Sequence, residues 1–467
     1  MPPEMIVAVP GQVVNLVQSG MLERAFHDGL FPALLYRQEA QWEEWEANIG
    51  TEIFMSRPGL LSPNTTPLTP GQDPTPQTLT WEQWAAVMGR YGDAIDVHMP
   101  TSAVANSDLF LRSIHQLGLQ AGQSINRVAR NRLFKAYLGG NTRVITQGTT
   151  AQDRIHVAAL NGFTFSMSTA AGLAHVRPQP LSAVNVLPIH IGTVAHNVIA
   201  TVPDYAADPD GPGDLVVAGT LGATIAVGTA VTSDIRPRII RIGGGATTDA
   251  LTASDTFVMQ AMILGVSYLR RNSVPPHEDG YYHLHANMDA NAQYFADDAV
   301  QRMLTARPEH VAFQEAIIGV APGCVSYLNN ESPDPHTAGN RISTGGSAYY
   351  SEDIGAETTN YTGVDIARCI ITGRGALYER GLDEAKYVSE AGITGKIGEF
   401  QVVNMGIQIP TNNVKLILRA PVNRMQDMVG AAWSITTDFP VPSDITSGLP
   451  AMFKRAVCIE HCGGTVS

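Results

Sequence analysis

One long amphipathic segment, residues 107–138, constrains the fold of this chain more than any other stretch. Ser107 suits a helix start, and Gly139 follows the last periodic turn as helix ends prefer. Over 32 residues such a helix would be roughly 48 Å long. Gly118 and Gly122 lie inside it and predict a close neighbour or a bend. Apolar residues recur at spacings of three and four, the period of a helix with one buried face: Phe110, Ile114, Leu117, Ala121, Ile125 and Val128.

A proline-rich stretch, residues 53–80, has the opposite character. Strand-like segments flank it at 52–55 and 81–87. A connection this long without secondary structure is uncommon inside a compact domain unless it has a function or is disordered. We therefore predict a long extended arm. Its prolines are Pro58, Pro63, Pro67, Pro70, Pro74 and Pro76.

The rest of the chain mixes helical and β-like patterns, which predicts an α+β fold. The first fifty residues are expected to be helical, including 38–48 with its two tryptophans. Short strands are predicted within a β domain at 178–250, namely at 194–202, 214–218, 224–232 and 237–242. Further along, we predict helices at 254–272 and 421–429, and strands at 280–286, 316–320, 325–329 and 414–420.

Composition excludes several classes of protein. Charged residues make up only 16% of the 467 residues, against about 25% in a typical soluble domain, and the net charge is −13. An acidic chain is a poor general nucleic-acid binder, and the low charge suggests that much of the surface is covered by something. The four cysteines all follow residue 323, which favours a reducing compartment. We expect no signal peptide and no membrane span.

Motifs for chemistry are weak. His283 and His285 share one face of a predicted strand and could bind zinc or iron, although a half-exposed strand face is the simpler interpretation. Cys458 and Cys462, with His461, lack a companion pair and are interpreted as buried small residues. No hydrolase, metalloprotease, P-loop or dinucleotide motif is present. We therefore predict no enzyme, no metal and no cofactor.

Charge is unevenly distributed along the chain. Residues 1–100 contain twelve acidic residues and four arginines, a net charge of −8, whereas residues 101–154 contain seven basic and two acidic residues, a net of +5. Complementary segments of this kind favour oriented association, within one molecule or between copies. Arginine is also the preferred cation for interface pairs with carboxylates.

The order of these parts resembles the major capsid proteins of tailed bacteriophages, which have the HK97 fold. The passage IFMSRPGLLSPNTTPLTP at 53–70 is similar to that family's arm-to-loop passage, and 103–140 is similar to its spine helix. Residues 280–289, 313–328, 418–433 and 438–442 resemble later segments of the same fold. The resemblance is to the larger coat proteins that carry an inserted β domain, and it is weakest over 178–250.

This resemblance implies an HK97-like division of the chain. The expected parts are an N-terminal arm (1–50), an extended loop (51–98), a spine helix and peripheral domain (99–177), an inserted β domain (178–250), an axial domain (251–400) and a C-terminal segment (401–467). It implies a non-enzymatic subunit that assembles as hexamers and pentamers into an icosahedral shell around double-stranded DNA, without sequence-specific binding. The shell would be a virion capsid, assembled in the bacterial host cytoplasm.

The resemblance also suggests partners and contacts. We expect a portal, a separate scaffolding protein and a possible cement or decoration protein. Some relatives crosslink a loop lysine to a neighbouring asparagine, but no lysine precedes Lys135 here, so we predict non-covalent contacts and no covalent ladder on a denaturing gel. The expected intersubunit contacts are Trp42, Trp45, Arg57, Arg112, Arg127, Arg130, Arg132 and Lys135.

Three alternatives remain open. An encapsulin-like compartment shell uses the same fold and would need a cargo-binding groove. A metal-dependent enzyme would use His283 and His285 and would contain stoichiometric metal. A secreted adhesin is disfavoured by the absence of a recognisable signal and by the low cysteine content.

Overall fold

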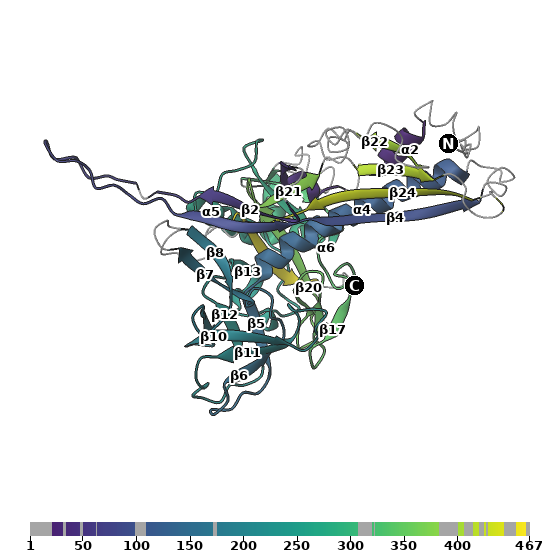
Figure 1. Ribbon diagram of the computed structural model, residues 1–467. Helices are drawn as coiled ribbons and strands as arrows, with labels where there is room; N and C mark the ends of the chain where they lie inside the picture. Colours follow the sequence, from purple (N-terminus) through teal and green to yellow (C-terminus); the bar gives the residue numbers. More distant parts are fainter. Residues whose placement is uncertain are drawn as a thin grey trace, which may run out of the picture. The chain divides into compact units, whose positions relative to one another are not determined.

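The computed structural model describes residues 21–30, 34–46, 50–61, 63–98, 109–170, 175–306, 320–321, 323–382, 400–405, 414–419, 425, 428–442 and 454–463 (Figure 1). The chain divides into two compact units. Unit 1 comprises Met1–Ile53, Ala85–Arg130 and Leu377–Pro440, and unit 2 comprises Phe54–Trp84, Asn131–Ala376 and Val441–Ser467. Both mix helices with strands. No helix within the described ranges is long and apolar enough to cross a membrane.

Unit 1 is organised around one sheet with the order β1-β21-β24-β23-β22, in which β4 also pairs with β24. The β1–β21 pair is parallel and the others are antiparallel. The two longest strands, β4 and β24, lie side by side from Met428↔His98 to Thr437↔Gly89 (Figure 1). The strand bounds are β1 Ala40–Trp45, β4 Gly89–His98, β21 Leu377–Leu382, β22 Phe400–Met405, β23 Val414–Arg419 and β24 Met428–Asp438.

The long helix α4, Leu109–Leu138, confirms the strongest sequence prediction. Its apolar stripe is buried, from Phe110 at 2% exposed to Ile125 at 2% exposed. Within unit 1 the short helix α2, Met21–Leu30, crosses it at Gly118. A Cβ on Gly118 would overlap the backbone carbonyl of Phe26, so this glycine is the close-neighbour site that the sequence predicted.

Unit 2 contains a closed six-stranded barrel with the order β10-β11-β6-β5-β12-β9. Its interior is apolar, and Val144, Ile155, Leu187, Leu215 and Val231 are all at most 1% exposed. The strands are β5 Asn141–Thr146, β6 Arg154–Val157, β9 Leu187–Ile191, β10 Val194–Pro203, β11 Gly213–Val217 and β12 Ala230–Ser233.

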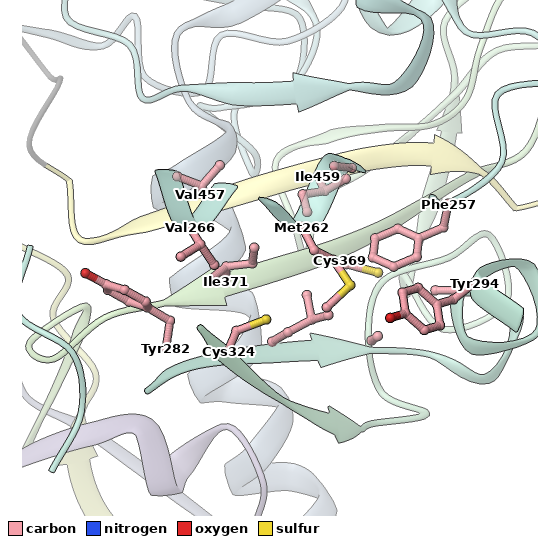
Figure 2. Packing of buried hydrophobic residues seen from close by; sticks show 14 of the residues in the cluster. Phe257, Met262, Val266, Tyr282, Tyr294, Cys324, Cys369, Ile371, Val457 and Ile459 are labelled. Carbon is pink, nitrogen blue, oxygen red and sulfur yellow. The ribbon is translucent and has the colours of Figure 1, made fainter. Parts of the chain in front are cut away.

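A six-stranded mixed sheet forms the second core of unit 2, with the order β13-β25-β20-β14-β16-β15. Its central strands β20 and β25 are buried along their whole length, so both faces of the sheet are covered. Figure 2 shows Met262 and Val266 of helix α5 meeting Cys369 and Ile371 of β20. The bounds are β13 Ile239–Arg241, β14 Tyr282–Ala286, β15 Val320–Ala321, β16 Cys324–Leu328, β20 Ile366–Thr372, β25 Ala456–Cys462 and α5 Met259–Arg271.

Smaller elements lie wholly or mostly in unit 2. A three-stranded sheet joins β17, β18 and β19, and a four-stranded sheet has the order β2-β3-β8-β7. Two helices, α6 and α7, follow β14 in the chain. Their bounds are α6 Met288–Ala296, α7 Asp298–Ala306, β2 Glu52–Pro58, β3 Trp81–Val87, β7 Phe165–Ala170, β8 His175–Pro180, β17 Arg341–Ser343, β18 Tyr349–Ser351 and β19 Ala356–Thr359.

Three sequence predictions are corrected. The described residues of the predicted helix 38–48 are not helical: after a short 3-10 turn, residues 40–45 form β1, because pairing with β21 outweighs the local helix preference. The β domain does not begin at 178, since the barrel takes two of its strands from 141–157. The helix predicted from 254 begins at Met259, and Asp255 instead accepts a hydrogen bond from the Thr252 amide.

Most predicted strands occur near their expected positions, including β10, β11, β14, β16 and β23. The expectation for 421–429 falls mainly outside the described residues, and β24 already begins at Met428. Residues 1–20, most of the predicted amphipathic N-terminal segment, also lie outside them.

Candidate functional site

The loop between β2 and β3 is the most unusual surface of the chain. Every described residue from 60 to 78 is exposed, and the segment extends as a long, narrow excursion whose two arms run side by side (Figure 1). The Gly59 amide donates to the Thr80 carbonyl at 2.7 Å and closes its base. Near its far end the Gln72 amide donates to the Thr69 carbonyl at 3.1 Å, next to Gly71 with φ of 85°. The excursion has no apolar core of its own.

The composition of this loop does not suit a surface that stays in water. Asp73 is the only charged residue in 59–80. Three leucines lie open to solvent, at 61% for Leu60, 56% for Leu61 and 63% for Leu68. Single exposed apolar residues are ordinary, but a group of them on an uncharged projecting ribbon indicates a contact surface.

Arg57 belongs to the base of the loop. Its guanidinium lies 3.2 Å from the Glu82 carboxylate and 5.7 Å from the centre of the Trp84 ring. Glu82 is 2% exposed and Trp84 is 5% exposed, so the pair joins β2 to β3 in a largely dry environment. Arg57 therefore holds the two strands of the loop together at their root within the subunit.

The basic residues of α4 do not form one continuous stripe. Arg112, Arg127 and Arg132 are exposed. Their spacings of 15 and 5 residues correspond to rotations of roughly 60° and 140° around a helix. The helix thus presents exposed cations in several directions, and these three are kept as proposed contacts between copies.

Several other predicted contact residues are used inside the subunit. Arg130 is 0% exposed and Trp45 is 4% exposed, so neither presents a surface to another copy in this conformation. The Lys135 ammonium lies 2.7 Å from the Asp210 carboxylate. Trp42 is half-buried on β1. The periodicity of α4 could have separated Arg130 from its exposed neighbours, because Arg130 follows the buried face at Asn126 by four residues.

His283 and His285 have different surroundings. The His283 ring stacks on His277 with centroids 3.9 Å apart, and its Nε2 lies 3.0 Å from Asp279. His285 is 1% exposed, with its Nδ1 3.5 Å from the Asn329 amide nitrogen. Both imidazoles also contact the Tyr327 ring, with centroids 5.0 Å away for His283 and 5.6 Å away for His285.

The four cysteines are buried free thiols. Burial raises the pKa of Cys324 to about 11 and that of Cys369 to about 12, which keeps both in the neutral form that binds metals poorly. Cys458 and Cys462 are four residues apart on one strand, roughly 13 Å along it, too far to share one ion.

A buried ionic group crosses three neighbouring strands of the mixed sheet. Arg241 on β13, Glu460 on β25 and Arg368 on β20 are cross-strand partners. Glu460 lies 2.8 Å from each guanidinium, and Arg368 and Glu460 are at most 1% exposed. Burial acts to raise the pKa of Glu460, but the two cations outweigh it and hold that pKa below its usual value.

Sequence reasoning missed a basic cavity beside this group. A hollow of about 570 Å³ in unit 2 is lined by Arg236, Arg238, Arg241 and Arg271, among other residues. The run RPRIIR at 236–241 was the available signal, because it places three arginines within six residues. Arg271 joins them only through the fold, since it lies at the end of α5.

No family model matches the chain, and no curated protein matches it. Among solved structures it is similar to the capsid of Ralstonia phage GP4, with 11% identity and a TM-score of 0.44 over 92% of this chain and 88% of that chain. It is also similar to the capsid asymmetric unit of cyanophage Pam1, with 11% identity and a TM-score of 0.46 over 93% and 92% of the two chains. It is similar as well to the mature capsid of bacteriophage PhiM1, with 7% identity and a TM-score of 0.43 over 91% of this chain and 86% of that chain.

Proposed function

We propose that this chain is a structural shell subunit, the major capsid protein of a tailed phage. The observation that carries the proposal is the exposed, nearly uncharged loop at 59–80 with its three open leucines. A projecting ribbon without a core is unfavourable on a lone molecule and favourable when a second copy covers it. Prolines add to this, because they reduce the entropy lost when the ribbon is held extended.

Burial of the loop leucines would contribute measurably to assembly. Completely burying an exposed leucine contributes roughly 1.5–3 kcal/mol. Three leucines that are each about 60% exposed would therefore contribute about 3–5 kcal/mol for every loop that docks on a neighbour. Because each subunit both offers a loop and receives one, such contacts are heterologous and can close into rings.

The finer features of the proposal follow from this arrangement. Hexameric and pentameric rings would build an icosahedral virion shell around double-stranded DNA, with a separate scaffolding protein, a portal and a possible decoration protein. The contacts would be non-covalent, since no lysine precedes Lys135 and Lys135 is itself paired with Asp210. Exposed Arg112, Arg127 and Arg132 would meet acidic segments of neighbouring copies.

The test replaces the apolar residues of the loop. Wild-type full-length protein is compared with a Leu60→Ser, Leu61→Ser, Leu68→Ser variant by light scattering and negative-stain microscopy over a range of concentrations. The matched control is Val184→Ser, Val202→Ser, Val227→Ser, which removes exposed apolar residues from other parts of unit 2. We expect closed or curved assemblies for wild type and control, and subunits alone for the loop variant.

Two results would overturn the proposal. One is a wild-type protein that stays monomeric at every concentration, whether it is expressed alone or together with the proposed scaffolding, portal and decoration proteins. The other is a loop variant that assembles as well as the control does. Uniform shells from the chain expressed alone would argue only against a separate scaffolding protein. A ladder of multimers on a reducing, denaturing gel would argue only against the prediction that the contacts are non-covalent.

A further inference from the structure

The basic cavity of unit 2 is not explained by shell assembly. It lies where the segment between β12 and β13 meets the last turns of α5. Its volume, about 570 Å³, is within the usual range of small-molecule sites. No aspartate or glutamate is among the described residues that line it.

The arginines of the cavity are poorly neutralised by the protein. Arg236 donates to the backbone carbonyl of Ser233 at 2.8 Å. Arg241 shares the Glu460 carboxylate with Arg368, so one negative charge serves two cations. Arg238 and Arg271 have no carboxylate within 4.0 Å among the described residues.

Nearby acidic residues do not neutralise the positive charge of these arginines. Asp234 is the closest in sequence, and its carboxylate lies 2.8 Å from His190. Burial is the main cause that lowers the pKa of Arg236; Asp234 opposes this effect, and the positive charges of Arg238 and Arg241 add to it. Like charges held together in this way are stabilised by an anion placed between them.

We propose that this cavity binds a phosphate-bearing ligand. A phosphate monoester carries a charge of about −1.5 to −2 at neutral pH and three acceptor oxygens, which matches several uncompensated guanidiniums better than a single carboxylate does. The planar guanidinium donates in pairs to phosphate oxygens. Tyr268 and Leu264 also line the cavity and offer an apolar wall to the organic part of the ligand.

The source of the phosphate is either a small molecule, such as a free phosphate or nucleotide, or a phosphodiester of nucleic acid. Both present phosphate oxygens to the same arginines, but a diester carries a single negative charge, less than the charge of about −1.5 to −2 of a monoester. The inference does not depend on shell assembly, because all of the lining residues belong to unit 2 of one chain.

The test measures binding by isothermal titration of the full-length protein in phosphate-free buffer. The probes are inorganic phosphate, pyrophosphate and a 16-base-pair DNA duplex of mixed sequence. The variants are Arg238→Gln and Arg271→Gln, both at exposed positions, and the control is Arg154→Gln, an arginine of the barrel that is 52% exposed. All three variants remove one positive charge.

We expect at least one probe to bind wild type and control equally, and each cavity variant to bind it roughly tenfold more weakly, which corresponds to about 1.4 kcal/mol. Nucleic acid is identified as the source if the duplex binds more tightly than pyrophosphate. In that case the slope of the logarithm of the binding constant against the logarithm of salt concentration should also become smaller by about one for each variant. Pyrophosphate binding that depends on Arg238, with duplex binding that does not, identifies a small molecule.

The proposal fails if no probe binds at millimolar concentration, or if the cavity variants and Arg154→Gln behave alike. Should either cavity variant fold poorly, arginine modification of the wild type by phenylglyoxal replaces it. Peptides containing Arg238 and Arg271 should then be protected by the bound probe, and equal modification with and without probe would refute the site.

Discussion

Replacing Glu460 by glutamine tests the charge balance in the core of unit 2. The substitution keeps the shape of the side chain but removes the one negative charge between Arg241 and Arg368. Arg368 is 0% exposed, so its charge would remain in a dry environment without a counter-ion. Breaking a buried ion pair in this way costs about 3–5 kcal/mol.

The four buried cysteines provide the assay, because all of them lie in unit 2 and each is at most 4% exposed. A thiol reagent can label them only when the unit opens, so the labelling rate follows the opening equilibrium. A loss of 3–5 kcal/mol predicts labelling faster by roughly 150- to 4,000-fold. We expect this for the unassembled subunit at pH 7.

Glu278→Gln is the matched control. Glu278 also pairs with an arginine, at 3.3 Å from Arg374, but it is 85% exposed and Arg374 is 51% exposed. Exposed pairs contribute at most about 1 kcal/mol, so labelling should rise no more than about fivefold. Equal labelling rates for the two variants would refute the argument that the Glu460 charge is required.

Two further predictions concern packing and pH. Gly118→Ala should destabilise unit 1 by about 1–3 kcal/mol, because the added Cβ would lie only 3.1 Å from the Phe26 carbonyl carbon. This loss is expected even though alanine is the better helix former, so a higher melting temperature of the variant would contradict the prediction. Burial lowers the pKa of His461 to about 4, so the unfolded chain binds more protons between pH 4 and 6.5. Stability should therefore decrease as the pH is lowered from 6.5 to 4, and His461→Gln should flatten the dependence of thiol labelling on pH. An unchanged slope would contradict the assignment.

Local patterns were enough to predict individual elements where one face of the element is buried in a regular period. The stripe from Phe110 to Ile125 predicted α4 because buried positions on a helix repeat every three to four residues. The prolines of 53–80 predicted the extended loop because each lacks the backbone N–H that a sheet ladder uses. Where pairing partners are distant, the same reasoning failed: β1 pairs with β21, more than 300 residues away in the chain.

The candidate sites also differ in how much of each could be predicted from the sequence. By itself, the sequence determined that the loop is long, nearly uncharged and without lysine, and these are the properties on which the shell proposal depends. Only the tertiary structure decided which cations are available. It buries Arg130 and Arg368 and gathers Arg238 and Arg271 around one cavity. The physical reason is that burial and charge pairing depend on contacts between residues far apart in the chain, which no local pattern encodes.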